Sequence, residues 1–242
     1  MGAVIRVWLI RHGQSESNAG LPSREPGSSV LTPLGHWQAE QVAAGFGQAP
    51  ALIVTSPYRR ARQTAEPSVK RFPEAACEEW PVQEFTYLGE LRKRAMTSIE
   101  REPYVQAYWE RSDPQEASGG AESFADLVRR SRDFLGRLSA QPGGPVAVFT
   151  HGLFMRSVAW SLVSGVTEPS TSDMRDFRRF AAVYRTPNGG VVELRTRPGR
   201  PAPSLMGGST FHLPADPPRP EAPPWPALQA PGELSPDELA PG

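Results

Sequence analysis

Three short runs of apolar and β-branched residues alternate with more polar segments along the chain. They cover residues 3–10 (AVIRVWLI), 51–56 (ALIVTS) and 145–150 (PVAVFT). Continuous apolar runs of this length are typical of strands buried on both faces of a sheet. A fourth segment, residues 81–90 (PVQEFTYLGE), is interpreted as a further strand and turn. The pattern predicts a sheet built around the three buried strands.

Segments with helical periodicity separate these strands. Helices are predicted over residues 32–46, 58–66, 121–140 and 153–165. The first has Thr32 as its N-cap and Pro33 at the first helical position, and Pro67 is expected to end or kink the second. The third is amphipathic, with apolar residues at helical spacing: Phe124, Leu127, Val128, Phe134, Leu135 and Leu138. Strands that alternate with helices indicate an α/β layer fold with a largely parallel sheet.

The C-terminal third of the chain changes character twice. Residues 180–197 (FAAVYRTPNGGVVELRTR) are interpreted as a hairpin across an Asn-Gly turn, which adds an antiparallel edge to the sheet. From residue 198 onward, proline recurs every few positions and aliphatic residues become rare. We therefore expect one domain over residues 1–197 and an extended or disordered proline-rich tail over 198–242, either passive or docked on the domain or a partner.

Polar residues that can take part in catalysis or ligand binding follow each of the three buried strands. Arg11 and His12 come directly after the first, the basic stretch around Arg59 follows the second, and His151 and Gly152 follow the third. Because ligands in open α/β sheets bind at the carboxyl ends of the strands, these side chains are expected at one rim. That expectation depends on the three strands being parallel neighbours.

Composition narrows the class of protein without pointing to a function. The 242 residues are 38% hydrophobic, and 26 Lys and Arg balance 26 Asp and Glu, so nothing global favours a nucleic acid or a membrane as partner. The single cysteine, Cys77, fits a reducing compartment, and the first apolar run is too short and too charged for a signal peptide. A cytoplasmic location is expected.

Two guanidinium groups and two imidazoles at one rim form an anion site that suits a phosphoryl group. Arginine donates paired hydrogen bonds to phosphate oxygens, and cationic neighbours keep an imidazole neutral and nucleophilic. The sequence contains neither HExxH nor GxxxxGK[ST], and no Asp/Glu cluster lies beside the histidines. Metal-free chemistry with no cofactor is therefore expected.

Five motifs in order resemble the histidine phosphatase superfamily, in its phosphoglycerate mutase-like branch. They are LIRHGQSESN, LTPLG, TSPYRRARQTA, GGAESFADLVRR and VFTHGLFMR, and the resemblance covers residues 4–195. It implies a three-layer sandwich in which helices flank a mainly parallel, mixed sheet. The resemblance also implies site roles.

By this resemblance His12 is the nucleophile that forms a phosphohistidine, and Arg11 and Arg59 hold the phosphoryl oxygens. His151 contacts an oxygen of the phosphoryl group in the transition state. Further substrate contacts come from Asn18 and from the backbone at Gly13 and Gly152.

The proton donor and the reaction stay open between alternatives. Glu84 is favoured as the general acid over Glu90, since it matches the acidic position of the family's loop. The favoured reaction is hydrolysis of a small phosphorylated metabolite. The alternatives are a cofactor-dependent phosphoglycerate mutase and a non-catalytic protein that binds phosphorylated ligands. Residues 91–118 are expected to cover the site. A homodimer is one assembly that the chain could form.

Overall fold

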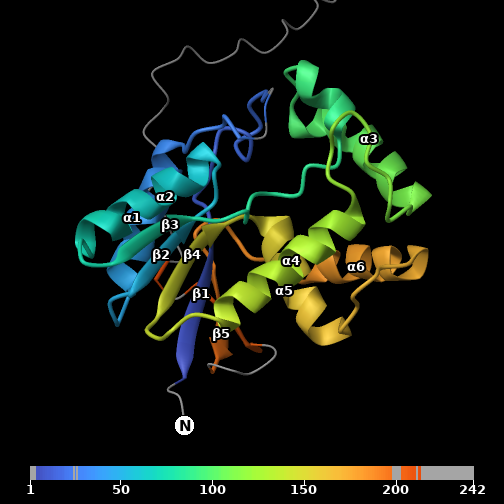
Figure 1. Ribbon diagram of the computed structural model, residues 1–242. Helices are drawn as coiled ribbons and strands as arrows, with labels where there is room; N and C mark the ends of the chain where they lie inside the picture. Colours follow the sequence, from blue (N-terminus) through green and yellow to red (C-terminus); the bar gives the residue numbers. More distant parts are fainter. Residues whose placement is uncertain (1–3, 24, 26, 198–202, 211, 214–242) are drawn as a thin grey trace, which may run out of the picture.

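A computed structural model gives the chain as a three-layer α/β sandwich (Figure 1). It describes residues 4–23, 25, 27–197, 203–210 and 212–213. The strands are β1 (Ile5–Arg11), β2 (Leu52–Thr55), β3 (Ala76–Glu79), β4 (Val146–Thr150), β5 (Val191–Thr196) and β6 (Ser204–Ser209). The helices are α1 (Pro33–Gly45), α2 (Arg59–Arg71), the 3₁₀-helix η1 (Gly89–Lys93), α3 (Ser98–Arg111), α4 (Phe124–Ser139), α5 (Gly152–Ser164) and α6 (Thr171–Val183).

The sheet has the order β3-β2-β4-β1-β5-β6. The pairs β3–β2, β2–β4 and β4–β1 are parallel, whereas β5 runs antiparallel to β1 and to β6. The prediction that the three apolar strands are parallel neighbours is therefore confirmed, as is the mixed, mainly parallel sheet. Their carboxyl ends lie at one rim.

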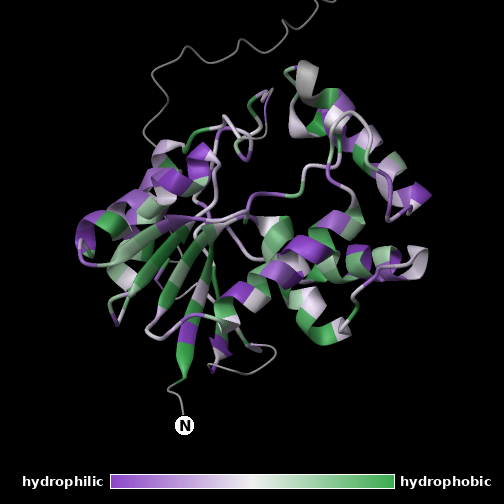
Figure 2. Ribbon diagram, viewed as in Figure 1, coloured by the Kyte–Doolittle hydropathy of each residue, from purple (hydrophilic) through white to green (hydrophobic). Residues whose placement is uncertain are grey.

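Both faces of the central strands are buried, which explains their continuous apolar sequences. In β1, Val7 and Leu9 belong to the larger core, together with side chains of α4, α5 and α6. Trp8 and Ile10 point to the opposite face and pack in a smaller cluster with Val42 of α1. The central strands β2 and β4 and most of β1 are accordingly hydrophobic in Figure 2, whereas the helices alternate hydrophobic and hydrophilic residues.

The predicted start of α1 is confirmed, whereas α4 begins at Phe124, within the predicted range 121–140. The side chain of Thr32 accepts a hydrogen bond from the backbone N–H of Gly35, with Pro33 at the first helical position. Ser123 and Asp126 form a capping box at the start of α4, and its apolar stripe is buried. Pro67 does not end α2, which continues to Arg71.

Two predictions about strands were wrong. The segment 81–88 is not a strand, and the preceding residues 76–79 form β3 instead. The expected hairpin over 180–197 does not form, because its first arm belongs to α6. A capping box of Ser170 and Asp173 starts this helix, and Met174, Phe177 and Ala181 bury one helical face.

The tail boundary at residue 198 is too early. Ser204–Ser209 pair with β5 as the edge strand β6, so part of the segment expected to be extended or disordered belongs to the sheet. β6 pairs with β5 although it contains Gly207 and Gly208, because strand pairing depends on backbone hydrogen bonds. Residues 214–242, which hold most of the proline-rich sequence, lie outside the described residues.

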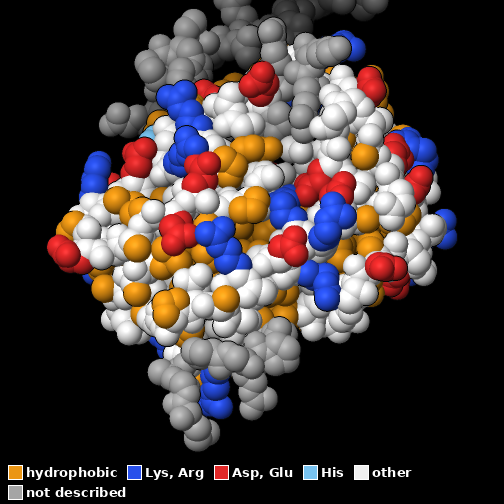
Figure 3. All heavy atoms as spheres, viewed as in Figure 1, with side chains coloured by type: hydrophobic (Ala, Val, Ile, Leu, Met, Phe, Trp, Pro, Cys, Tyr) orange, Lys and Arg blue, Asp and Glu red, His pale blue; other side chains and the backbone are white. Residues whose placement is uncertain are grey.

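The surface shows no dominant charge on the face seen in Figure 3, where acidic and basic side chains are interspersed with apolar ones. No helix in the described part of the chain combines the length and the apolar character needed to cross a membrane.

Candidate active site

The two histidines expected at the strand ends lie against one another. The centroids of the His12 and His151 rings are 5.0 Å apart. His12 follows β1, and its backbone N–H donates to the carbonyl of Thr150 at the end of β4. This hydrogen bond extends the parallel pairing of the two strands by one residue, and it brings the imidazole after each strand to the same point.

Hydrogen bonds define the tautomer of His12. Its Nδ1 lies 2.7 Å from the carbonyl oxygen of Gly13, which can only accept, so Nδ1 carries the proton. Its Nε2 lies 3.0 Å from Nε of Arg60, which can only donate. The lone pair of the imidazole is therefore on Nε2, the nitrogen directed toward the guanidinium of Arg60.

The arginine beside His12 is Arg60, and the expectation for Arg59 is corrected. Arg59 is the exposed first residue of α2, whereas Arg60 is 7% exposed and faces the sheet. The buried face of α2 is formed by residues one turn apart, Arg60 and Thr64 among them. A helix turns by about 100° per residue, so the neighbour of a buried arginine points elsewhere.

Arg11 lies on the other side of the histidine pair, at the end of β1. Its Nη1 donates to the carbonyl of Thr186 over 2.7 Å, and its Nε is buried with no hydrogen-bond partner among the described residues. Burial lowers the pKa of Arg11, Glu84 raises it and Arg156 lowers it. A buried guanidinium with an unused donor is expected to bind an anionic acceptor.

His151 is completely buried and is positioned by a residue that the sequence analysis missed. Its Nε2 lies 2.8 Å from Oγ of Ser56, the buried residue that follows β2. The ring of Tyr58 packs edge-on against the imidazole with centroids 5.1 Å apart. Ser56 could have been found by position, because it follows its strand as His12 and His151 follow theirs.

Both imidazoles are held in the neutral form. Burial lowers the pKa of His12 well below 6.5, and the charge of Arg60 lowers it further against the opposing hydrogen bond to Gly13. Burial also lowers the pKa of His151 well below 6.5, followed by the charge of Arg60. A neutral imidazole with its lone pair on an accessible nitrogen can act as a nucleophile.

Glu84, and not Glu90, lies in this cluster. The Oε1 atom of Glu84 accepts backbone N–H groups of Leu153 and Phe154 over 3.0 and 3.2 Å, at the N-terminus of α5. These contacts hold the carboxyl group beside the histidine pair. Glu90 is exposed in η1 and does not line the cavity described below.

Asn18 reaches the rim from the loop after β1. Its Oδ1 accepts hydrogen bonds from both the backbone N–H and the hydroxyl of Ser15, and from Nδ2 of Asn188. Asn188 also donates to the carbonyl of His12 over 3.0 Å. Asn188, read in the sequence as a turn residue only, thus links the loop before β5 to the backbone at the histidine.

The two glycines expected near the substrate differ in the space around them. A Cβ at Gly13 would lie 2.4 Å from the carbonyl oxygen of Gly35 at the start of α1. The two motifs RHG and LTPLG are therefore in direct backbone contact. Gly152 lies beside the side chain of Arg11, whose Nε would be in ordinary contact, at 3.4 Å, with a Cβ at that position.

A cavity of 360 Å³ opens over the cluster. Its charged lining residues are Arg11, Arg60, Glu84 and Arg101, and the neutral imidazole of His12 lines it as well. Leu91, Ser98 and Val105 lie on the opposite wall, so the expected roof from residues 91–118 is present. His151 is packed behind His12 and is not part of the cavity wall.

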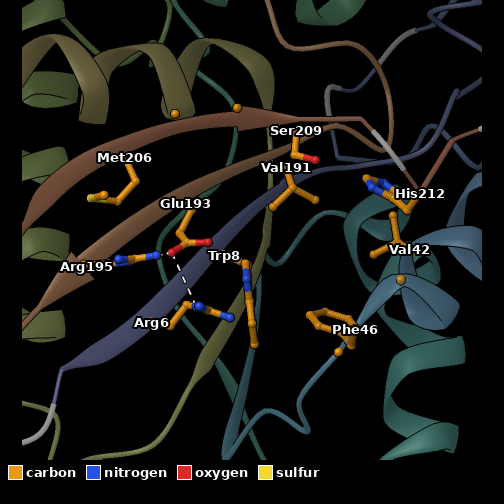
Figure 4. A pocket seen from close by; sticks show the side chains of 14 residues that line it. Arg6, Trp8, Val42, Phe46, Val191, Glu193, Arg195, Met206, Ser209 and His212 are labelled. Atoms are coloured by element: carbon orange, nitrogen blue, oxygen red, sulfur yellow. Dashed lines mark hydrogen bonds and ion pairs between the residues drawn. The ribbon is translucent and has the colours of Figure 1, made fainter.

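A separate cavity of 470 Å³ lies between β1, the β5–β6 edge and the end of α1 (Figure 4). Its two arginines, Arg6 and Arg195, are both ion-paired with Glu193. None of the residues expected in the site lines it. This cavity is therefore distinct from the one over the histidine pair.

Comparison with known proteins agrees with this geometry. The model of branch 1 of the histidine phosphatase superfamily matches residues 7–206. The chain belongs to this family. As a histidine phosphatase superfamily member, it is 30% identical over 169 residues to glucosyl-3-phosphoglycerate phosphatase of Mycobacterium tuberculosis, covering 65% of this chain and 75% of that protein.

This superfamily member is also similar to a second curated protein and to a solved structure. Metal-independent phosphoserine phosphatase of Arabidopsis thaliana is 29% identical over 160 residues, 64% of this chain and 67% of that protein. The solved structure of a mycobacterial glucosyl-3-phosphoglycerate phosphatase superposes with a TM-score of 0.62 at 24% identity. It covers 85% of this chain and 98% of that one, and at this identity it supports the fold.

Proposed function

We propose that the chain is a metal-independent phosphomonoester hydrolase that acts through a phosphohistidine on a small phosphorylated metabolite. The observation that carries the proposal is the state of His12. Its Nδ1–H donates to the carbonyl of Gly13, and its Nε2 lone pair accepts a hydrogen bond from Arg60. The charges of Arg60 and Arg11 both act on the imidazole. Nucleophile and cationic groups thus converge where a phosphoryl group fits.

In the first step Nε2 of His12 attacks phosphorus, and the bond from phosphorus to the ester oxygen breaks. Arg60 exchanges its hydrogen bond to Nε2 for one to a phosphoryl oxygen, and Arg11 uses its unpartnered Nε in the same way. Preorganised donors of this kind stabilise the charge of the transition state. The ring of His151 packs against that of His12, and its contact with a phosphoryl oxygen stays a prediction.

Glu84 is the proposed acid and base. It donates a proton to the departing oxygen in the first step, and in the second it takes a proton from the water that attacks the phosphohistidine. The products are an alcohol, inorganic phosphate and free His12. Glu84 lies in the cavity wall with His12, which supports this role.

Support for a phosphatase comes from the relatives, two of which carry phosphatase names. The names of these relatives support a small phosphorylated metabolite as the substrate class. The cytoplasmic location and the homodimer stay predictions.

The test is hydrolysis of p-nitrophenyl phosphate in the presence of EDTA. We expect turnover that EDTA leaves unchanged and that His12→Ala abolishes, with an acid-labile phosphoprotein formed only when His12 is present. Turnover lost in EDTA would contradict the metal-independent reaction. Rapid formation of 2-phosphoglycerate from 3-phosphoglycerate with trace 2,3-bisphosphoglycerate, and little phosphate release, would instead establish a mutase.

A further inference from the structure

A second cavity adjoins the proposed active site and has a distinct chemical character. It encloses 750 Å³ between the start of α5, the end of α6 and helix α3. Four residues line both this cavity and the one over His12: Arg11, Tyr87, Val105 and Leu153. The two cavities therefore adjoin at Arg11.

The second cavity is strongly cationic. Its charged lining residues are Arg11, Arg156, Arg178, Arg185 and Glu102. Four guanidinium groups thus face one carboxylate. None of Arg156, Arg178 and Arg185 forms an ion pair with a described residue, in contrast to the arginines of the cavity in Figure 4. The charge of this wall is therefore available to a ligand.

Arg156 connects the cationic wall to the active site. Its Nε donates to the carbonyl of Tyr184 over 3.0 Å, which fixes the side chain and leaves the terminal nitrogens without a partner in the described chain. Burial lowers the pKa of Arg156, Glu84 raises it and Arg185 lowers it. Arg156 therefore lies within electrostatic reach of both the proposed acid and the outer arginine.

We infer that this cavity binds a second anionic group on the substrate's leaving part, with Arg156, Arg178 and Arg185 as its contacts. The inference rests on the proposed function, since it places the reacting phosphoryl group at His12. Guanidinium groups bind a carboxylate or a phosphate through paired hydrogen bonds, and either group fits this wall. Tyr87 and Val105, shared by the two cavities, pack against the carbon skeleton between the anionic ends.

The test compares esters that differ in the distal charge. One pair is 3-phosphoglycerate and glycerol 3-phosphate, and a longer pair is 6-phosphogluconate and sorbitol 6-phosphate. Fructose 1,6-bisphosphate and fructose 6-phosphate test a distal phosphate. We expect the more anionic member of at least one pair to have the higher kcat/KM by about tenfold or more, the scale of one charge-assisted hydrogen bond.

The same comparison is made with two variants of α6. Arg178→Gln changes the cavity, and Arg175→Gln is its control on the same helix. Both arginines are exposed, and only Arg178 lines the cavity. Arg178→Gln is expected to remove most of the preference for the anionic substrate, while p-nitrophenyl phosphate and the neutral member change less than about twofold. Arg175→Gln is expected to leave both values unchanged.

A binding measurement separates this inference from the proposed function. Calorimetric titration of His12→Ala with the same pairs needs no turnover. Tighter binding of the anionic member, weakened by Arg178→Gln, supports the subsite even where p-nitrophenyl phosphate is not hydrolysed. Hydrolysis of p-nitrophenyl phosphate with no anionic preference in rate or binding, or an equal loss on both members in Arg178→Gln, overturns the subsite alone.

Discussion

Arg60 donates its Nε–H to Nε2 of His12 over 3.0 Å, while Arg59, its neighbour in sequence, is exposed to solvent. The two arginines open the same helix and differ by one residue in rotation about its axis. Only the second shares a face with Thr64, whose hydroxyl accepts the backbone N–H of Gly13. The N-terminal turn of α2 therefore supports both the side chain and the backbone of the proposed nucleophile.

Replacement of Arg60 by alanine is expected to lower kcat/KM for p-nitrophenyl phosphate by roughly two to three orders of magnitude. It removes a buried cation that the transition state requires, and such donors contribute on this scale. Arg59→Ala, the control one residue away, is expected to change the rate by less than about twofold. Steady-state kinetics of the two variants decide the point, and an equal loss in both would contradict the placement of Arg60.

The strand ends were predictable from sequence, but the residue of α2 that faces the site was predicted wrongly. An apolar run followed by Arg-His or His-Gly marks a buried strand and the rim where it ends. Choosing between Arg59 and Arg60 requires the buried face of the helix. Ala61, Thr64 and Ala65 carry that information, because small side chains at this spacing mark close packing against a sheet.

The hairpin error has a related cause. Asn188-Gly189 is a strong turn signal, and it outweighed the helical spacing of Met174, Phe177 and Ala181. The antiparallel edge exists because β5 pairs with β1 and β6, which lies beyond the proline boundary. Long-range pairing of this kind has no local sequence pattern. The fold class was predictable, whereas the strands that form its edge were not.

Loss of the Ser56 hydroxyl is expected to slow catalysis through His151. Ser56→Ala removes the 2.8 Å contact to Nε2 and leaves a buried imidazole without that partner. We expect kcat for p-nitrophenyl phosphate to fall roughly tenfold with KM unchanged, since one hydrogen bond is worth about that factor. Ser68→Ala is the control, because Ser68 is also buried but lies within α2, and this variant should retain full kcat. A rise in KM alone would argue against this positioning role.

Glu84→Gln tests the proposed acid without removing its structural contacts. The amide oxygen of glutamine can still accept the backbone N–H groups of Leu153 and Phe154. The rate on an alkyl ester such as glycerol 3-phosphate is expected to fall by roughly 10²–10⁴, because an alkoxide needs a proton to leave. The rate on p-nitrophenyl phosphate should fall much less. Equal losses on both esters, or a comparable effect of Glu90→Gln, would remove Glu84 from this role.

The contact between the RHG and LTPLG motifs predicts that Gly35 tolerates no side chain. A Cβ at Gly35 would lie 2.0 Å from the carbonyl oxygen of Gln14, a backbone atom that cannot turn away. Gly35→Ala is expected to reduce the free energy of unfolding by about 2 kcal/mol or more, measured by urea denaturation. Gly136→Ala is the opposite control. Its Cβ meets nothing within 4 Å in α4, so stability should rise by about 0.5–1 kcal/mol.

The free energy of unfolding is expected to decrease as the pH is lowered, because of the two buried histidines. Burial holds the pKa of His12 and of His151 well below 6.5 in the folded chain, with Arg60 adding to both shifts. The unfolded chain protonates both near pH 6.5, so below that pH it binds more protons than the folded chain. The stabilisation is complete above pH 6.5 and is lost progressively as the pH falls toward the folded pKa values.

Each histidine should therefore contribute up to about 2 kcal/mol to the difference in unfolding free energy between pH 7 and pH 5, the limit set by protonation of the unfolded chain alone. Urea denaturation at the two pH values measures it, and comparison with a variant cancels the carboxylate contribution. His12→Gln and His151→Gln are each expected to reduce the pH dependence by that amount. His36→Gln is the control, since its imidazole is exposed on α1. If all three variants keep the full pH dependence, the imidazoles are not held neutral by burial, and a neutral His12 nucleophile loses its physical basis.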